Sequence, residues 1–151
     1  MIIDHEIDIW YLTGFVGHDA TLVVGPDIAA ILCDARYEEY LTPWKNGGVH
    51  QVHIGPRQEL VRRIRTVAQE AGIGTFAFQA EHLTVARLQQ FRTELDGFDF
   101  VSSLGHVLAL RKIKDEHELG IIEHCIDIQQ RALRASLGQL ERGMTEERFT
   151  A

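Results

Sequence analysis

The first part of the chain consists of short apolar runs separated by turn residues. Residues 20–24 and 28–33 are apolar and of strand length, and residues 25–27, Gly-Pro-Asp, have the composition of a tight turn. This pattern predicts a β-hairpin. Neither run alternates polar with apolar residues, which indicates a sheet covered by helices on both faces. Residues 49–54 alternate better and predict a further strand.

From Pro56 onward the hydrophobic period becomes that of a helix. Apolar residues recur at spacings of three and four until Gly72, which can end the helix in a left-handed conformation. Residues 75–78 then predict a strand, residues 84–97 a second helix, and residues 98–101 a last strand. The order strand, helix, strand, helix, strand is typical of an α/β sheet with crossover helices.

The last third of the chain predicts one long amphipathic helix over residues 115–142. Asp115 and Glu118 can form a capping box, and apolar residues follow at spacings of mostly three and four. Such a helix is about 40 Å long, which exceeds the width of a small α/β domain. A partner chain or sequence beyond Ala151 is therefore expected to cover its apolar stripe. Thr145 can cap a further helix, so we expect the chain to stop inside a structural element.

Composition places these elements in an ordinary globular protein. The chain has 151 residues, of which 45% are hydrophobic and 25% charged, with 13 Gly and 3 Pro, and this excludes collagen-like and disordered classes. No uncharged stretch approaches the roughly 20 residues of a membrane span. The first residues carry acid where a signal peptide carries base, so a cytoplasmic location is expected. The net charge is −7, and residues 1–56 hold eight acidic and two basic side chains, which disfavours nucleic acid as a partner.

Two further groups of residues are interpreted as structural. Cys33 lies in an apolar run and Cys125 in a helical pattern, without a CxxC motif, so both are predicted to be buried thiols. Four arginines at helical spacing are predicted to form a solvated helix face; they are Arg57, Arg62, Arg63 and Arg65.

Candidate catalytic groups are sparse. His50 and His53 are three apart on a predicted strand and therefore point to opposite faces. His117 and His124 are seven apart on a helix, about 10 Å, which is too far to share one metal ion. The sequence contains no nucleophile elbow, no phosphate-binding glycine loop and no base paired with either cysteine. The stretch 11–19 remains, interpreted either as a binding loop or as a structural turn.

Three blocks of sequence point to a family. Residues 11–17 are Tyr-Leu-Thr-Gly-Phe-x-Gly, residues 33–37 are Cys-Asp-Ala-Arg-Tyr, and residues 110–118 are Leu-Arg-Lys-Ile-Lys-x-x-x-Glu, followed by Gly-Met-Thr-Glu at 143–146. In order and spacing they resemble the amino-terminal domain of Xaa-Pro aminopeptidases and dipeptidases, in the creatinase and prolidase superfamily. The last blocks resemble the junction at which that family passes into its catalytic domain.

The resemblance implies a fold and a division of the chain. Residues 1–108 are expected to form a mixed sheet with flanking helices, ribonuclease H-like, and residues 109–151 a linker and the first long helix of a truncated pita-bread catalytic domain. In that family two divalent ions, commonly manganese or cobalt, are held by two Asp, one His and two Glu, and a bridging hydroxide attacks the bond before proline. Those ligands lie beyond the position that matches Ala151. No catalytic residue, metal ligand or cofactor is therefore expected in this chain, and two metal ions are expected in the full-length protein.

The resemblance also implies roles for single residues. Family members are dimers or higher oligomers whose loop after Thr-Gly-Phe reaches toward the partner subunit's active site. The residues expected to bind a proline-containing peptide in this way are Phe15, Gly17, His18 and Asp19. Of these, His18 and Asp19 are expected at the peptide's amino end or prolyl side. Structural roles are expected for the family-motif residues Tyr11, Gly14, Asp34, Arg36 and Tyr37, with Arg36 pairing an acid. The helix that usually precedes the first strand in relatives is expected to be absent or shortened here.

The leading hypothesis is a non-catalytic amino-terminal domain of a proline-specific metallopeptidase that serves oligomerisation and shapes the partner subunit's substrate site. Its expected partners are its own catalytic domain, a second copy of the chain and, in the full-length protein, proline-containing peptides. One alternative is a protein-binding module of the same fold without peptidase activity, for which the acidic front half suits a basic partner. Another is the amino-terminal domain of a creatinase-type amidinohydrolase. An Asp, Asp, His, Glu, Glu series beyond Ala151 would indicate an enzyme.

Overall fold

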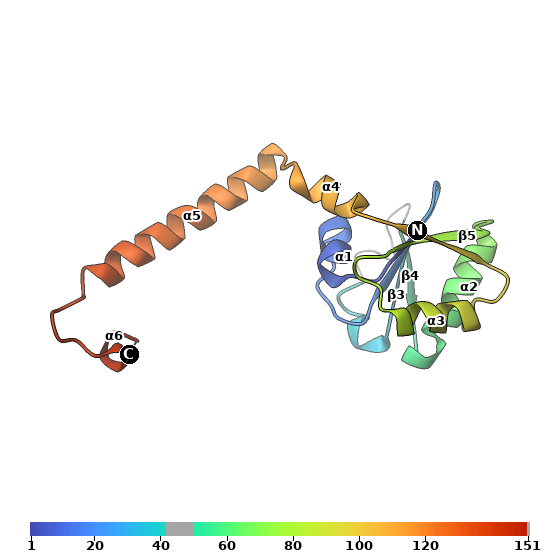
Figure 1. Cartoon of the computed structure of the whole chain (residues 1–151), viewed down its shortest axis with the longest axis horizontal. Coiled ribbons are helices and arrows are strands. Elements are labelled where there is room, and N and C mark those ends of the chain that lie inside the picture. Colours follow the sequence, from blue (N-terminus) through green and yellow to red (C-terminus); the bar gives the residue numbers. More distant parts are fainter. Residues whose placement is uncertain (42–49, 151) are drawn as a thin grey trace. The chain divides into compact units, whose positions relative to one another are not determined.

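The first of two compact units is built on one mixed β-sheet (Figure 1). The computed structural model of the chain describes residues 1–41 and 50–150. This unit comprises Met1–Arg111, and the other comprises Lys112–Ala151. The strands are β1 (Ile2–Ile3), β2 (Thr21–Val24), β3 (Ala29–Cys33), β4 (His50–Ile54), β5 (Thr75–Gln79) and β6 (Asp99–Ser103). The sheet order is β4-β3-β2-β1-β5-β6, in which β2 is antiparallel to both β1 and β3 and the other neighbours are parallel.

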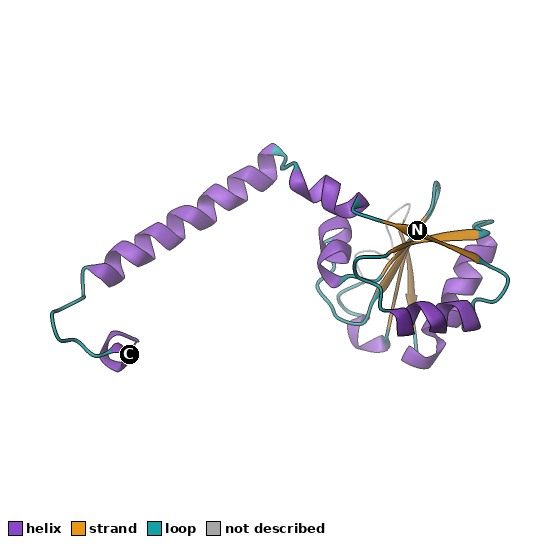
Figure 2. Cartoon of the chain, viewed as in Figure 1, coloured by secondary structure: helices purple, strands orange, loops and turns teal. Residues whose placement is uncertain are grey.

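Helices cover both faces of this sheet (Figure 2). They are α1 (Glu6–Thr13), α2 (Leu60–Glu70), α3 (Val85–Glu94) and α4 (His106–Lys112), with short 3-10 turns η1 (Ala35–Tyr37) and η3 (Arg57–Glu59). Apolar side chains of α2 and α3 pack on one face, around the fully buried Phe76 of β5. Those of α1 and α4 pack on the other face, around Leu22 and Ile31, which are paired in the β2–β3 hairpin. The mixed α/β fold expected from the sequence is present.

Most of the predicted elements are confirmed. The hairpin, the strand now called β4 within its described residues, the helix before Gly72 and the strands β5 and β6 lie where the pattern put them. Thr84 caps α3, since its side chain accepts a hydrogen bond from the amide of Arg87 at 3.2 Å. The capping box of Asp115 and Glu118 is also formed.

The helix α1 lies between β1 and β2 and was not predicted from the sequence. Residues 11–13, interpreted as the start of a loop, are its last residues. Its sequence shows no helical hydrophobic period, because the apolar residues Ile7, Trp10 and Tyr11 are exposed on the same turns in which Ile9 is buried. Buried Asp8 adds a polar residue to the inner side, so no clean apolar stripe marks the helix.

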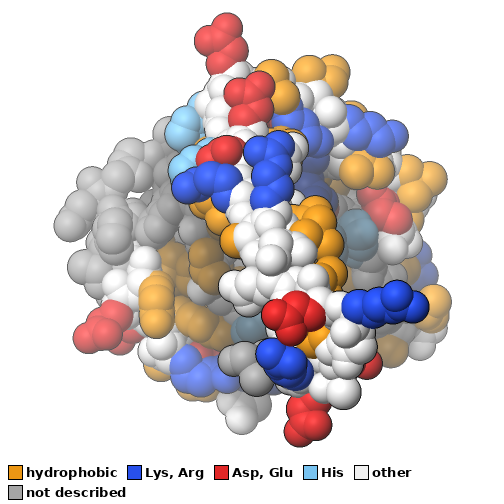
Figure 3. Space-filling model, turned by 90° about the vertical axis from the view of Figure 1, so that its left-hand side faces the viewer, with side chains coloured by type: hydrophobic (Ala, Val, Ile, Leu, Met, Phe, Trp, Pro, Cys, Tyr) orange, Lys and Arg blue, Asp and Glu red, His pale blue; other side chains and the backbone are white. Residues whose placement is uncertain are grey.

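The second unit contains α5 (Glu116–Leu137) and α6 (Glu146–Thr150). The long helix ends at Leu137, with Gly138 as its C-cap, rather than at residue 142. Within this unit the apolar residues of α5 are 41–59% exposed; they are Leu119, Ile121, Ile122, Ile126, Ile128, Leu133 and Leu137. Hydrophobic side chains are visible at the surface among charged ones in Figure 3. Cys33 is buried as predicted, but Cys125 is exposed, and none of the residues of α5 is buried.

No helix in the described parts of the chain is both long and apolar enough to span a membrane.

Candidate functional site

A tight turn after α1 begins the loop of residues 14–19. Gly14 has φ 72°, a left-handed conformation that a side chain would disfavour, and its amide donates to the carbonyl of Trp10. The hydroxyl of Thr13 donates to the carbonyl of Ile9 at 2.6 Å and accepts the amide of Phe15 at 3.1 Å. The Thr-Gly-Phe sequence therefore ends the helix and turns Phe15 into the core.

Aromatic packing joins this loop to η1. Phe15 is only 3% exposed and meets the ring of Tyr37 edge to face, with ring centroids 5.4 Å apart. Gly17 lies against both rings, so a Cβ atom there would come within 2.3 Å of Cζ of Phe15 and 3.0 Å of Cε1 of Tyr37. The phenol oxygen of Tyr37 accepts the amide of His18 at 3.0 Å. The Tyr-Leu-Thr-Gly-Phe and Asp-Ala-Arg-Tyr blocks thus form one structure.

A network of ionic groups holds the far end of the loop. Asp34 caps η1 by accepting the amide of Arg36 at 2.9 Å, and it also accepts the Nε atom of Arg36. These hydrogen bonds hold the pKa of Asp34 below its usual value and raise the pKa of Arg36. Arg36 reaches on to Asp19, with its Nη2 atom 3.2 Å from Oδ2. Arg57 contacts the same carboxylate from η3, with its Nη2 atom 2.9 Å from Oδ1.

Asp19 has an unusual backbone conformation. Its φ is 60°, and it is the one non-glycine residue in the described parts of the chain with positive φ. Such a conformation costs an L-residue roughly 1–2 kcal/mol, less for Asp and Asn, so surrounding contacts have to support it. The two arginines supply that support.

His18 is the outward-facing member of the loop. Its side chain is 77% exposed, and its Nδ1 atom lies 2.9 Å from Oε2 of Glu6 on α1. Beside it lies an open, largely apolar hollow of about 250 Å³, whose walls include Trp10 and Val16. Those two side chains are 56% and 72% exposed. We call residues 14–19, together with Asp34, Arg36 and Tyr37, the loop site.

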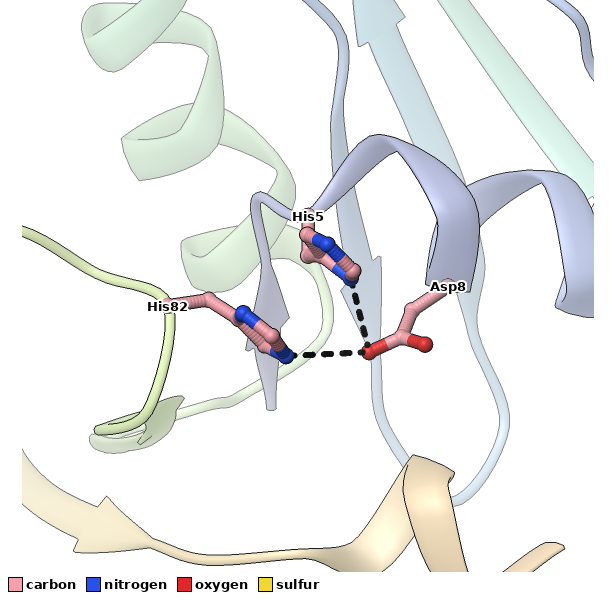
Figure 4. A group of neighbouring side chains, drawn as sticks. All are labelled: His5, Asp8 and His82. Carbon is pink, nitrogen blue, oxygen red and sulfur yellow. Dashed lines mark ion pairs between the residues drawn. The ribbon is translucent and has the colours of Figure 1, made fainter. Parts of the chain in front are cut away.

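A second polar cluster surrounds Asp8, which is 99% buried (Figure 4). Its Oδ2 atom accepts the Nε2 atom of Gln79 at 2.6 Å, and its Oδ1 atom accepts Arg111 at 2.9 Å. His5 and His82 lie 3.3 and 3.9 Å from Oδ2. Burial pushes the pKa of Asp8 up, but hydrogen bonds from Gln79 and Arg111 outweigh it and leave that pKa below its usual value.

This cluster does not fit the pair of metal ions that the resemblance implies for the full-length protein. Among the described residues, His5, Asp8 and His82 form the one group with three ligand atoms close enough to meet an ion. The two imidazole rings are stacked, with centroids 3.7 Å apart and planes 1° from parallel. Their in-plane lone pairs therefore do not converge on one point, and Arg111 already neutralises the carboxylate. A carboxylate-rich site for two ions is absent from the described part of the chain.

The structure brings most of the sequence-derived candidate residues together, but not all of them. It brings Phe15, Gly17, His18 and Asp19 together with Asp34, Arg36 and Tyr37, whereas Tyr11 is a 36% exposed residue of α1 without a place in these contacts. The side chain of His50 lies outside the described residues.

The expected solvated arginine face holds for Arg57 and Arg62, which are exposed, but not for Arg63 and Arg65, which are partly buried. Arg57 pairs with Asp19, Arg63 lies 3.4 Å from Glu59, and Arg65 donates to the carbonyls of Glu94 and Asp96. Helical spacing alone does not show the partners of Arg57 and Arg65, because these lie far away in the sequence, whereas Glu59 lies one turn before Arg63.

Replacing Gly17 by alanine is expected to destabilise the first unit by about 1–3 kcal/mol, as overpacking does in other cores. The new methyl group would overlap Phe15, which is buried and cannot move freely. Gly74→Ala is the matched control, since a Cβ there meets nothing within 4 Å. Chemical denaturation of both variants measures the difference. Equal stability of the two would contradict the tight contact between Gly17 and Phe15.

Comparison with known proteins identifies a family that the chain matches. Residues 1–113 match the family described as Creatinase/Prolidase N-terminal domain. Among curated relatives, the chain is 26% identical over 146 residues to the "Uncharacterized peptidase YqhT" of Bacillus subtilis (strain 168). That alignment covers 97% of this chain and 40% of the relative.

Solved structures show the same fold. The Xaa-Pro dipeptidase from Bacillus anthracis superposes with a TM-score of 0.83 at 22% identity, covering 98% of this chain and 41% of that one. The X-Pro aminopeptidase from Thermotoga maritima MSB8 superposes with a TM-score of 0.83 at 20% identity, covering 97% of this chain and 41% of that one. The N-terminal domain of cytoplasmic peptidase PepQ from Mycobacterium tuberculosis H37Rv superposes with a TM-score of 0.61 at 28% identity, covering 73% of this chain and 85% of that one. The chain thus spans about two fifths of the length of YqhT and of the two longer structures.

Proposed function

The chain belongs to the creatinase/prolidase N-terminal domain family, and we propose that it is the non-catalytic amino-terminal domain of an Xaa-Pro aminopeptidase or dipeptidase. In that role it serves oligomerisation and completes the substrate site of a partner subunit. The observation that carries the proposal is the geometry of the loop site. The phenol oxygen of Tyr37 holds the backbone amide of His18, whereas the imidazole of His18 is 77% exposed. A fixed backbone with an exposed polar tip suits recognition of a ligand.

The proposed catalytic centre belongs to sequence that follows this chain in the full-length protein. We assign residues 1–108 to the amino-terminal domain and residues 109–151 to a linker and the first helix of the catalytic domain. The chain's 40% coverage of a peptidase relative supports this division, as do the exposed apolar residues of α5, which need a covering surface. Two divalent ions, manganese or cobalt, would be held by that domain. A cytoplasmic location is part of the proposal, supported by the likeness to the cytoplasmic peptidase PepQ.

The loop site is proposed to act on a second copy of the chain. Trp10 and Val16 place exposed apolar surface directly beside His18, which is the composition of a contact between subunits. Burying this surface against a partner would bring His18 to the partner's bound peptide. Its Nδ1 atom is held by Glu6, so Nε2 is the atom available to a peptide terminus.

Replacing His18 by alanine in the full-length protein is expected to lower kcat/KM for an Xaa-Pro dipeptide by about ten- to a hundredfold, the value of one hydrogen bond to a charged group. The effect should be largely on KM if the bond is already made to the bound substrate. His117→Ala is the control, since that exposed histidine lies on α5 in the other unit. Steady-state kinetics with unchanged kcat/KM in His18→Ala would contradict the proposal.

Hybrid oligomers test whether the loop acts on a partner. A subunit carrying His18→Ala but an intact catalytic domain is mixed with a subunit that has an intact loop and an inactivated catalytic domain. Action on the partner predicts that mixing restores activity, because the intact loop then serves the intact catalytic domain. Activity that stays at the level of the His18→Ala protein would place the loop's action within its own subunit.

A further inference from the structure

We propose that Arg57 is a positioning residue, which clamps Asp19 together with Arg36 and thereby sets the direction of His18. The inference deepens the proposed function and rests on it for its effect on catalysis. It assigns Asp19 and His18 different tasks: the carboxylate of Asp19 is held by the two arginines, and the imidazole of His18 faces the ligand.

Arg57 and Arg36 together contact both oxygens of the Asp19 carboxylate. Arg57 approaches it with two nitrogens, Nη2 at 2.9 Å from Oδ1 and Nη1 at 3.3 Å from Oδ2. Arg36 adds a third contact at 3.2 Å to Oδ2. A planar guanidinium that binds both carboxylate oxygens fixes their orientation as well as their position. A carboxylate held in this way is a poor acceptor for the amino end of a peptide.

The two arginines are not equivalent. Arg36 divides its guanidinium between Asp34 and Asp19, and it belongs to the same turn as its nearer partner. Arg57 comes from η3, 38 residues along the chain from Asp19, and its hydrogen bond and ion pair in the described parts of the chain are both with Asp19. Arg57 therefore links the loop site to the beginning of α2.

The backbone of Asp19 shows why a clamp is needed. Its φ of 60° lies in the left-handed region, and His18 directly precedes it. Without the clamp, residue 19 is expected to relax toward ordinary φ values, which would turn the peptide that joins it to His18. The amide of His18 would then leave the phenol oxygen of Tyr37, and its side chain would leave Glu6.

Amide hydrogen exchange of the 151-residue chain tests the clamp without catalysis. Arg57→Ala and Asp19→Asn are each expected to speed exchange at the amide of His18 by about fivefold, because local opening becomes easier by about 1 kcal/mol. Arg62→Ala, an exposed neighbour on α2, should stay within about twofold of the wild type. Amides of the β2–β3 hairpin report whether each variant remains folded. A folded Arg57→Ala variant with unchanged exchange at His18 would overturn the inference.

Kinetics of the full-length protein show whether Arg57 acts through His18. Arg57→Ala is expected to raise KM for an Xaa-Pro dipeptide by about three- to tenfold, with less change in kcat. In a His18→Ala background the same change should add nothing. Arg57→Lys, which keeps the charge but not the two-pronged contact, should recover only part of the loss.

The two proposals fail separately. A further loss from Arg57→Ala in the His18→Ala background would overturn the positioning role. Faster exchange at His18 in Arg57→Ala, together with normal kinetics in His18→Ala, would support the clamp and reject the proposed function of the loop.

Discussion

Replacing Arg111 by alanine is expected to lower the free energy of unfolding of the first unit by about 3 kcal/mol. Removing one partner of a buried ion pair leaves an uncompensated charge, which costs roughly 3–5 kcal/mol, and the lower end applies because Arg111 is 31% exposed. At roughly 4 °C per kcal/mol, the expected fall in Tm is about 12 °C. Denaturant titration and calorimetry of the 151-residue chain measure it.

Arg57→Ala is a matched control, because it removes an ion pair of the same length that is more exposed. Arg57 also lies 2.9 Å from its acid, but its side chain is 69% exposed and that of Asp19 is 34% exposed. Arg57→Ala should therefore cost no more than about 1 kcal/mol. Adding Asp8→Asn to Arg111→Ala should recover part of the stability, because no charge then remains buried. Equal losses in Arg57→Ala and Arg111→Ala would show that burial of Asp8 does not decide the energy.

The acid dependence gives a second measurement of the same pair. The pKa of Asp8 is lower in the folded protein than its usual value, so its ionised form contributes stability above the unfolded pKa of about 3.9. That contribution is lost as the pH falls through the folded pKa. The difference in free energy of unfolding between the wild type and Arg111→Ala should thus become smaller below about pH 4.

Elements with one strong local signal could be predicted from the sequence. The β2–β3 hairpin, α2 and the capped start of α5 each combine an apolar period with a turn or cap residue, and each forms where that pattern lies. These signals act over a few residues, and tertiary packing agrees with them. The Thr-Gly-Phe turn belongs to the same class, because its hydrogen bonds join neighbours.

Contacts between distant residues could not be predicted in this way. Asp19 and Arg57 meet across 38 positions, and Asp8 and Arg111 across 103. The cluster of His5, Asp8 and His82 was missed for the same reason, since β1 and β5 must pair before those residues can approach. Acidic Asp8 within the short apolar α1 was a usable signal, because a charge on the buried side of a helix requires a partner.

The 151-residue chain by itself is expected to show no metal-dependent hydrolysis of Xaa-Pro dipeptides, whereas the full-length protein should hydrolyse them. Hydrolysis by two hard cations needs several converging carboxylates, and the described acids near the loop site are instead paired with basic groups, as Asp19 is with Arg57 and Glu6 with His18. Release of proline and manganese content after dialysis are the measurements, with the full-length protein as positive control.

The proposed function places the loop site and the catalytic centre in different domains. If the chain only completes a site built by another domain, adding it to the full-length protein carrying His18→Ala is expected to restore activity by subunit exchange. The added chain alone is expected to hydrolyse no peptide. Metal-dependent turnover by the chain alone would show instead that the described residues hold a catalytic centre. The Asp8 cluster would then be the first place to look, and Arg111, which now neutralises that carboxylate, would have to move away from it.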